Sequence, residues 1–233
     1  MKISFATATG SLHLEEGTGC QDAVGAYKGK DFSLIVLSDG AGSKEYGEDS
    51  AQLIVDTVIN YFKNADSDIF KSFDADNFTS QINNAFEEYG MYEESAGGTL
   101  IFVLCNAKKY LVGHMGDGVA IMQNTANLTL LSAPENGKLV NTTFFFPCSE
   151  PMRHFRFKVG NVGAPFAFII ASDGIESLLY DYEKKSIAPA CKNIIDWANT
   201  YDEEKLSEIL SDNIKEIFSK YTSDDISIAV MVN

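Results

Sequence analysis

Apolar residues occur along this chain in two patterns, short continuous runs and runs spaced three or four residues apart. The continuous runs predict buried strands at residues 33–37, 99–105, 110–115, 119–122, 167–171 and 226–232. The spaced runs predict helices over residues 43–63, 78–89, 187–198 and 203–218. Asp76 and Thr79 are candidate caps for the second of these helices.

The order of the predicted elements indicates the fold class. Residues 2–38 and about 99–172 are rich in strands, and the helices follow these blocks in groups instead of alternating with single strands. This order favours an α+β layered sandwich with mostly antiparallel sheets over a parallel, doubly wound fold. At 233 residues the chain has the length of one domain with a full core, so we expect a single domain over residues 1–233.

Composition excludes several classes of partner. The formal net charge of −15 argues against a nucleic-acid backbone or an anionic membrane, because both attract clustered Lys and Arg. No apolar run approaches the roughly 20 residues of a membrane span. The apolar stretch among the first eight residues is too short for the hydrophobic region of a secretory signal. Four cysteines without C-x-x-C spacing are expected to be free thiols. These features predict a cytoplasmic protein.

Carboxylates follow the ends of several predicted strands. Apolar runs stop at Ser38-Asp39-Gly40, at Gly116-Asp117-Gly118 and at Ser172-Asp173-Gly174. Asp22 precedes another apolar stretch, and the pair Asp224-Asp225 precedes the last strand. Each site alone is compatible with ordinary turn chemistry, because Asp and Gly are common turn formers. Strand ends can nevertheless hold several carboxylates at one place.

Converging carboxylates need a counter-charge. Two like charges ~4 Å apart at an effective dielectric of ~20 repel by about 4 kcal/mol. A hard divalent cation removes this repulsion, and magnesium and manganese prefer oxygen ligands, whereas zinc favours His and Cys. The residue types therefore predict a Mg²⁺ or Mn²⁺ site.

The order of the motifs resembles the metal-dependent protein phosphatases of type 2C, and the bacterial single-domain members in particular. The motifs extend over about residues 10–232 and are, in order, Gln21-Asp22, Asp39-Gly40-Ala41-Gly42, Gly97-Gly98-Thr99, Gly116-Asp117-Gly118, Ser172-Asp173-Gly174 and Asp224-Asp225-Ile226-Ser227. The resemblance implies a four-layer αββα sandwich, in which two antiparallel sheets are flanked by helices, with a binuclear Mn²⁺ or Mg²⁺ site in a cleft.

The resemblance also implies a role for each matching position. Asp39 would bridge two metal ions, the Gly40 carbonyl would bind one of them, and Asp173 and Asp224 would complete the coordination of the other. Asp117 would hold a third, weaker ion together with Asp173. Asp22 would hydrogen-bond water on the metals.

The implied activity is hydrolysis of phosphoserine and phosphothreonine in proteins by a metal-activated water. The substrate would be a phosphoprotein, and a cognate Ser/Thr kinase would be a further partner. No covalent phosphoenzyme is needed, because two cations make water nucleophilic and neutralise the phosphoryl charge.

The chain also departs from the family pattern. Gln21 stands where many members have Glu, and Ala41 stands where some members have a His proposed to protonate the leaving group. The Arg that binds substrate phosphate in many eukaryotic members has no evident counterpart. His13 is a candidate for phosphate contact, with a structural role as the alternative. Asp224 is the expected ligand of the Asp pair, with Asp225 as the alternative.

Two other functions remain open at this point. Gln21 and Ala41 are compatible with a catalytically impaired phosphatase fold that serves as a binding or regulatory module. A phosphatase with Asp39 as covalent nucleophile, as in haloacid dehalogenase-like enzymes, would need a second Asp where Ala41 stands. Residues 136–162 are expected to form either a flap over the cleft or a connector with part of the core.

Overall fold

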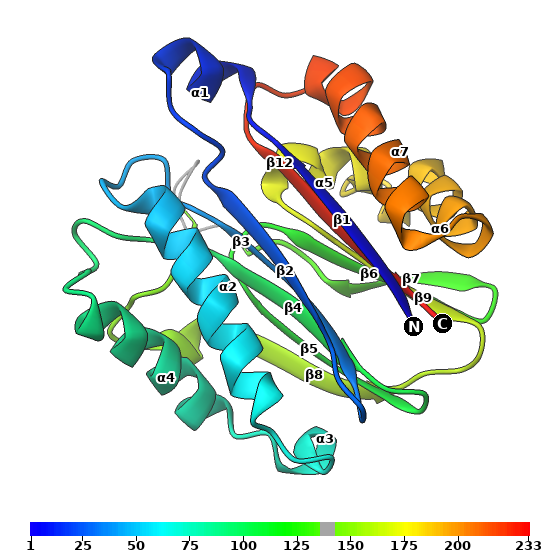
Figure 1. The fold of residues 1–233 in the computed structure, drawn as a ribbon, viewed down its shortest axis with the longest axis horizontal. Coiled ribbons are helices and arrows are strands. Elements are labelled where there is room, and N and C mark those ends of the chain that lie inside the picture. The colour runs from blue at the N-terminus through cyan, green and yellow to red at the C-terminus, as the bar shows by residue number, and fades with distance from the viewer. Residues whose placement is uncertain (136–142) are drawn as a thin grey trace.

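The computed structural model describes residues 1–135 and 143–233, and within them the strands form two large antiparallel sheets (Figure 1). In the first sheet the strand order is β1 (Lys2–Ala8), β12 (Ile226–Val232), β9 (Phe166–Ala171), β6 (Val119–Asn124) and β7 (Asn127–Ser132). In the second sheet the order is β2 (Asp22–Lys28), β3 (Ser33–Asp39), β4 (Leu100–Cys105), β5 (Lys109–Met115) and β8 (Arg156–Asn161). A separate small hairpin is formed by β10 (Tyr180–Asp181) and β11 (Ser186–Ile187).

Helices cover the outer face of each sheet (Figure 1). The sheet that contains β3 packs against α2 (Gly47–Lys63), α3 (Ile69–Ser72) and α4 (Ala75–Glu88). The sheet that contains β12 packs against α5 (Asp173–Leu179), α6 (Pro189–Thr200) and α7 (Glu203–Glu216). The short helix α1 (Ser11–Glu16) joins β1 to β2, and two 3₁₀ turns occur at Pro151–Arg153 and Phe218–Lys220.

Three separate apolar clusters hold these four layers together. In β3, Leu34 and Val36 pack toward α2 and α4, whereas Ile35 and Leu37 pack toward the other sheet. The third cluster lies between the β12 sheet and its own helices. Because successive side chains of a strand point to opposite faces, a strand covered on both faces must be apolar at every position. This explains the continuous apolar runs, and the predicted four-layer sandwich is confirmed.

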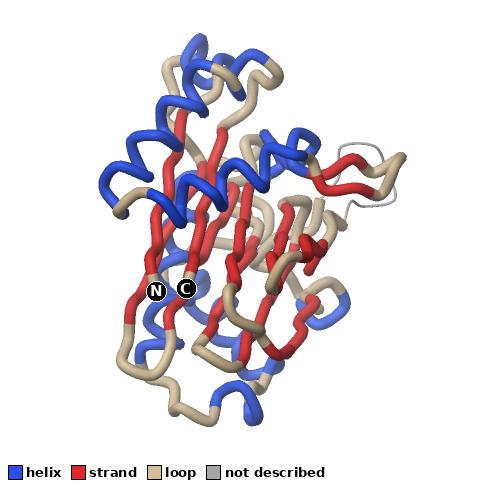
Figure 2. Tube along the Cα trace, turned by 90° about the vertical axis from the view of Figure 1, so that its right-hand side faces the viewer, coloured by secondary structure: helices blue, strands red, loops and turns tan. Residues whose placement is uncertain are grey.

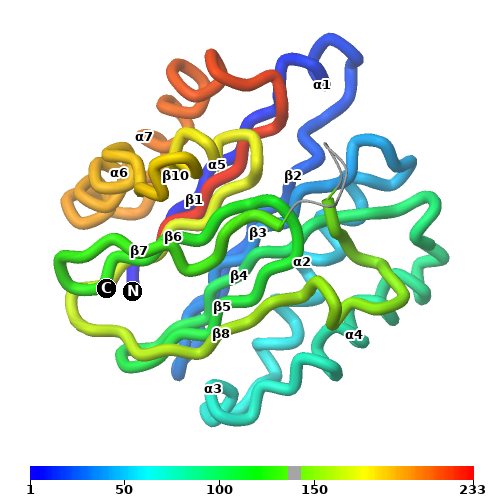
Figure 3. The backbone as a smooth tube through the Cα atoms, turned by 180° about the vertical axis from the view of Figure 1, so that it is seen from behind, coloured from blue at the N-terminus to red at the C-terminus, as the bar shows by residue number. Residues whose placement is uncertain are grey.

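The chain termini lie next to each other, because β1 and β12 are neighbours in the first sheet. Lys2 pairs with Val232 in this ladder, and the markers of the two ends are adjacent in Figures 1 and 2. The opposite edge of the same sheet is formed by β7, which is visible with β6 in the view from behind (Figure 3). Among the described residues no helix is long and apolar enough to cross a membrane.

Two local predictions were incomplete or wrong. The N-cap of α4 is Asp74, whose side chain accepts a hydrogen bond from the Asn77 N–H at 3.0 Å, and not Asp76 or Thr79. Thr79 lies inside the helix, where its hydroxyl donates to the Ala75 carbonyl. The strand-rich start of the chain also contains α1, which none of the sequence patterns indicated because it has no buried residue.

The segment after residue 142 combines core and cleft residues. Phe146 is fully buried and exchanges two backbone hydrogen bonds with Gly98, whereas Phe145 lines a cleft described below. The first part of the predicted flap or connector, residues 136–142, lies outside the described residues.

Candidate metal centre

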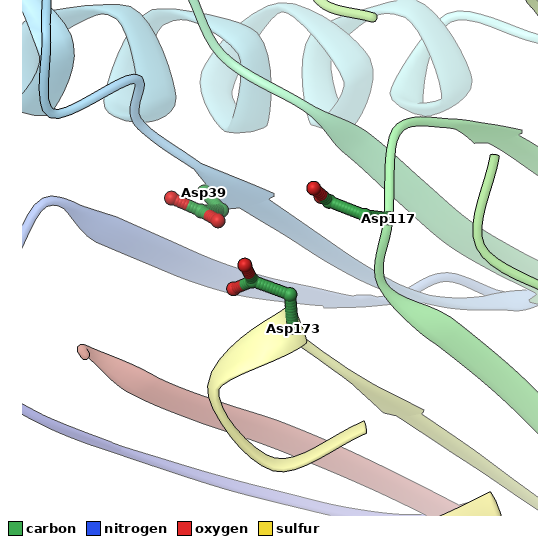
Figure 4. A group of neighbouring side chains, drawn as sticks. All are labelled: Asp39, Asp117 and Asp173. Carbon is green, nitrogen blue, oxygen red and sulfur yellow. The ribbon is translucent and has the colours of Figure 1, made fainter. Parts of the chain in front are cut away.

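Three carboxylates from distant parts of the chain converge at one end of the sandwich. Asp39 ends β3, Asp117 lies in the turn between β5 and β6, and Asp173 begins α5. Their side chains point toward one another (Figure 4), and one carboxylate oxygen from each lies within 4.8 Å of the other two. Three oxygen donors at this spacing can bind a single cation.

Backbone contacts hold Asp39 at its position. The Asp39 N–H donates to Thr99 Oγ1 at 2.9 Å, and the Thr99 N–H donates back to the Asp39 carbonyl at 2.8 Å. The next residue must be glycine, because a methyl group on Gly40 would lie 2.2 Å from the Gly47 carbonyl oxygen. Thr99, the last residue of the Gly-Gly-Thr motif, therefore holds the end of β3 in place, although it does not itself line the cleft.

Asp22 and Asp117 are positioned by their neighbours. Asp22 is the register partner of Asp39 in the β2–β3 ladder, so both side chains project from the same face of the sheet. The Oδ2 atom of Asp22 is buried and has no hydrogen-bond partner in the described part of the chain. Asp117 Oδ2 accepts a hydrogen bond from the Thr143 hydroxyl.

The two acidic residues before β12 have different environments. Asp224 lines the same cleft as Asp39, Asp117 and Asp173. The carboxylate of Asp225 is only 3% exposed and accepts the N–H groups of Gly10, at 2.7 Å, and Gln21, at 2.5 Å. The geometry therefore favours Asp224 as the residue that faces a metal ion, and Asp225 connects the start of β12 to the segment before β2.

The cleft around these carboxylates has a volume of about 510 Å³. Its other walls include Gly42, Thr143 and Phe145, together with Ser43 and Lys44, which no sequence motif marks. Lys44 Nζ donates to the Glu93 carbonyl at 2.6 Å, so its charge is partly engaged outside the carboxylate cluster. His13 also lines the cleft, whereas Ala41 contributes only a methyl group.

Burial and mutual repulsion raise the pKa values of the site carboxylates. Burial, followed by the charges of Asp22, Asp173 and Asp117, holds the pKa of Asp39 well above its ordinary value. Burial also raises the pKa of Asp173 to about 7, with the charges of Asp117 and Asp224 acting in the same direction. The pKa of Asp22 is likewise raised by burial to about 7, against the opposing effect of the Ser227 and Ser172 hydroxyls.

This donor set fits a hard divalent cation. Carboxylate oxygens crowded in a partly buried site are stabilised when a cation replaces the protons that they otherwise retain. Asp39, Asp117 and Asp173 offer oxygen only, which suits Mg²⁺ or Mn²⁺. The unpartnered Oδ2 of Asp22 leaves one further acceptor beside Asp39 for a water or an ion.

Comparison with known proteins agrees with this picture. A family model described as Protein phosphatase 2C matches residues 9–211. No curated protein matches the chain.

Solved structures share the fold. A bacterial serine phosphatase is 17% identical with a TM-score of 0.71, covering 100% of this chain and 97% of its own. Stp1 from Staphylococcus aureus, a serine/threonine phosphatase, is 15% identical with a TM-score of 0.70 and coverages of 100% and 95%. The catalytic domain of the serine/threonine phosphatase PstP, in complex with two manganese ions, is 16% identical with a TM-score of 0.67 and coverages of 98% and 96%.

Proposed function

We propose that this chain, which belongs to the protein phosphatase 2C family, hydrolyses phosphoserine and phosphothreonine in proteins with the help of divalent metal ions. The observation that carries the proposal is the convergence of Asp39, Asp117 and Asp173 in one cleft. The substrate is a phosphoprotein, and the kinase that phosphorylates it is the implied opposing partner. Residues 1–233 act as one catalytic unit, because the site draws on residues from Asp22 to Asp224.

The residues of the cleft divide the work of holding the ions. Asp39 and the Gly40 carbonyl, with Asp173 and Asp224, would hold two ions, and Asp117 with Asp173 would hold a third. Manganese or magnesium suits these oxygen donors, and the manganese complex of PstP supports manganese. When bound, such ions supply a nucleophilic water near neutral pH and neutralise charge on the phosphoryl group. Thr143 orients Asp117, and Asp22 offers an acceptor for a water proton.

Metal dependence is the first test of this function. A chelator should abolish hydrolysis of p-nitrophenyl phosphate and of a phosphoserine peptide, and manganese or magnesium should restore both activities. A reagent that blocks thiols should leave both rates unchanged, because none of the four cysteines lines the cleft. The measurement is the initial rate with and without each treatment. Full activity of the metal-free protein would contradict the proposal.

The same assay separates the main alternatives. A phosphatase fold that serves only as a binding module would show no turnover at any manganese concentration, although it would still bind manganese. A covalent mechanism through Asp39 would leave an aspartyl phosphate that mass spectrometry can detect in a rapidly quenched reaction.

Asp117 should contribute less to metal binding than the other carboxylates do. Asp117→Ala should lower kcat by about tenfold or more, because the residue completes only the third position. Calorimetry with manganese should still show two bound ions. Thr143→Val removes only the hydroxyl that donates to Asp117, so it should also lower kcat, but by a smaller factor than Asp117→Ala does. An Asp117→Ala protein that binds no manganese would disprove this division.

A further inference from the structure

One histidine faces the cleft from an element outside the carboxylate cluster. His13 lies on α1, a helix in which no residue is buried, yet its side chain is only 16% exposed. It lines the cleft together with Asp39, Asp117, Asp173 and Asp224. The neighbouring Leu12 and Leu14 are 53% and 66% exposed, so α1 presents His13 inward and its leucines outward.

Asp225 lies against the His13 ring. The Nδ1 atom of His13 lies 2.9 Å from Asp225 Oδ2. Asp225 is itself held by the N–H groups of Gly10 and Gln21, and Gly10 packs so closely that a methyl group there would lie 2.4 Å from the Ser223 carbonyl oxygen. The carboxylate favours a proton on Nδ1, because it can only accept. Nε2 is then the ring nitrogen free to exchange a proton.

The free nitrogen faces the loop that follows Gly40. A methyl group on Gly42 would lie 3.7 Å from His13 Nε2, which places this atom beside the backbone just after Ala41. Ala41 itself has no proton to donate. The imidazole of His13 therefore extends from α1 to the loop after β3, where Ala41 offers no proton donor.

The reaction needs a proton donor at this place. When the P–O bond of phosphoserine breaks, its electron pair stays on the serine oxygen, which becomes a strongly basic alkoxide unless it is protonated. Asp39, Asp117, Asp173 and Asp224 line the cleft as the proposed cation ligands, and Lys44 Nζ donates to the Glu93 carbonyl. Protonation of a leaving group by a positioned side chain contributes ~10²–10⁴-fold.

We propose that His13 is the general acid, which transfers its Nε2 proton to the serine or threonine oxygen as the P–O bond breaks, with Asp225 as its positioning residue. This inference rests on the proposed function. Water supplies the new P–O bond, the alcohol leaves with the proton from His13, and neutral His13 regains a proton from solvent through the open cleft.

The charges around His13 support this role. Burial lowers the pKa of His13, but the contact with Asp225, a carboxylate that lies outside the proposed cation ligands, raises it, and the pKa is above its ordinary value. The nearby Cys20 adds no charge near neutral pH, because burial and the charges of Asp22 and Asp225 raise the pKa of its thiol to about 12. His13 is therefore able to carry the required proton near neutral pH.

Two substrates with different leaving groups test the proposal. Nitrophenolate is stable without protonation, whereas the serine alkoxide is not. In the manganese-loaded protein, His13→Gln should lower kcat/KM for a phosphoserine peptide by about a hundredfold or more, and for p-nitrophenyl phosphate by less than about threefold. Leu14→Ala, on the exposed side of the same helix, is the matched control and should leave both rates unchanged.

Each other outcome has a defined meaning. Equal losses on both substrates in His13→Gln would overturn the inference, because a phosphate contact or a structural role affects both substrates. A loss selective for the peptide in Lys44→Ala, but not in His13→Gln, would assign the acid to Lys44. A wild-type protein that hydrolyses neither substrate would contradict the proposed function itself, and the inference with it.

A spectroscopic measurement tests the orientation without turnover. Nitrogen-15 NMR of the magnesium-loaded protein can follow its three histidines from about pH 5 to about pH 9, and His13→Gln assigns the signal. We expect neutral His13 to carry its proton on Nδ1. A proton on Nε2 in the neutral ring would overturn the orientation by Asp225.

Discussion

Asp39→Ala should reduce kcat by about a thousandfold or more. Asp39 pairs with Asp22 across the ladder, and one of its carboxylate oxygens lies within 4.8 Å of an oxygen from Asp117 and from Asp173. In the proposed site Asp39 would be the ligand shared by two ions, so its loss would weaken the binding of both. Metal-assisted stabilisation of the transition state is worth several kcal/mol, and about 4 kcal/mol corresponds to a thousandfold change in rate. The measurement is kcat for p-nitrophenyl phosphate at saturating manganese.

A control at the other end of the same strand makes this result specific. Asp31 is exposed and lies just before β3, so Asp31→Ala removes an equal charge without affecting the cleft. It should retain the wild-type rate. If Asp39→Ala and Asp31→Ala retained the same activity, Asp39 would be a turn residue and not part of a metal site.

Metal ions should stabilise the fold strongly, and this stabilisation should depend on Asp39. The clustered carboxylates repel one another in the metal-free native state, whereas the unfolded chain separates them. At a free manganese concentration ~100 times the Kd, preferential binding to the native state adds about 2.7 kcal/mol. For a domain of this size each kcal/mol raises Tm by ~2–4 °C, so we expect a rise of roughly 5–10 °C.

Asp39→Asn should raise the Tm of the metal-free protein and reduce the gain in Tm from manganese. It removes one of the mutually repelling charges, so its metal-free form should melt at a higher temperature than the metal-free wild type. It should then gain little from manganese. Thermal unfolding of both proteins, with chelator and with manganese, measures the effect. An equal shift of Tm by manganese in both proteins would show that Asp39 does not bind the metal.

The stability of the metal-free protein should also depend on pH. The folded-state pKa values of Asp22 and Asp173 are about 7, above the ordinary value of 3.8. Between these values the native state binds more protons than the unfolded state, so the free energy of unfolding should fall as pH rises from about 4 to about 7. Saturating manganese should reduce this slope, because the metal replaces the protons. A metal-free protein whose Tm increases steadily over this window would contradict the raised pKa values.

Much of the fold could be predicted from the sequence, because a strand that is buried on both faces is apolar at nearly every position. Strands β3, β4, β9 and β12 are buried along nearly their whole length, and each appears in the sequence as a continuous apolar run. Helices α2, α6 and α7 bury one stripe and therefore show helical spacing. Helix α1 buries no residue, so its sequence carries no apolar spacing that could predict it.

Only part of the candidate site could be predicted from the sequence. The acidic residues at strand ends and the order of the motifs pointed to Asp39, Asp117 and Asp173 before their distances were known. Their convergence within 4.8 Å depends on the pairing of strands and on the packing of one sheet against the other. The role of Thr99 in the Gly-Gly-Thr motif likewise becomes evident only from its two hydrogen bonds with the Asp39 backbone.

The sequence by itself determined the layers, the acidic strand ends and the family to which they belong, because these follow from local periodicity and motif order. Only the tertiary structure showed that Asp224 lines the cleft whereas Asp225 is buried beside it, and only it placed His13 in the cleft. Asp225 accepts the N–H of Gly10 across 215 positions of the chain, and this contact turns Asp225 toward the segment before β2. Such contacts between distant segments arise from the packing of the whole chain, so no local pattern of residues records them.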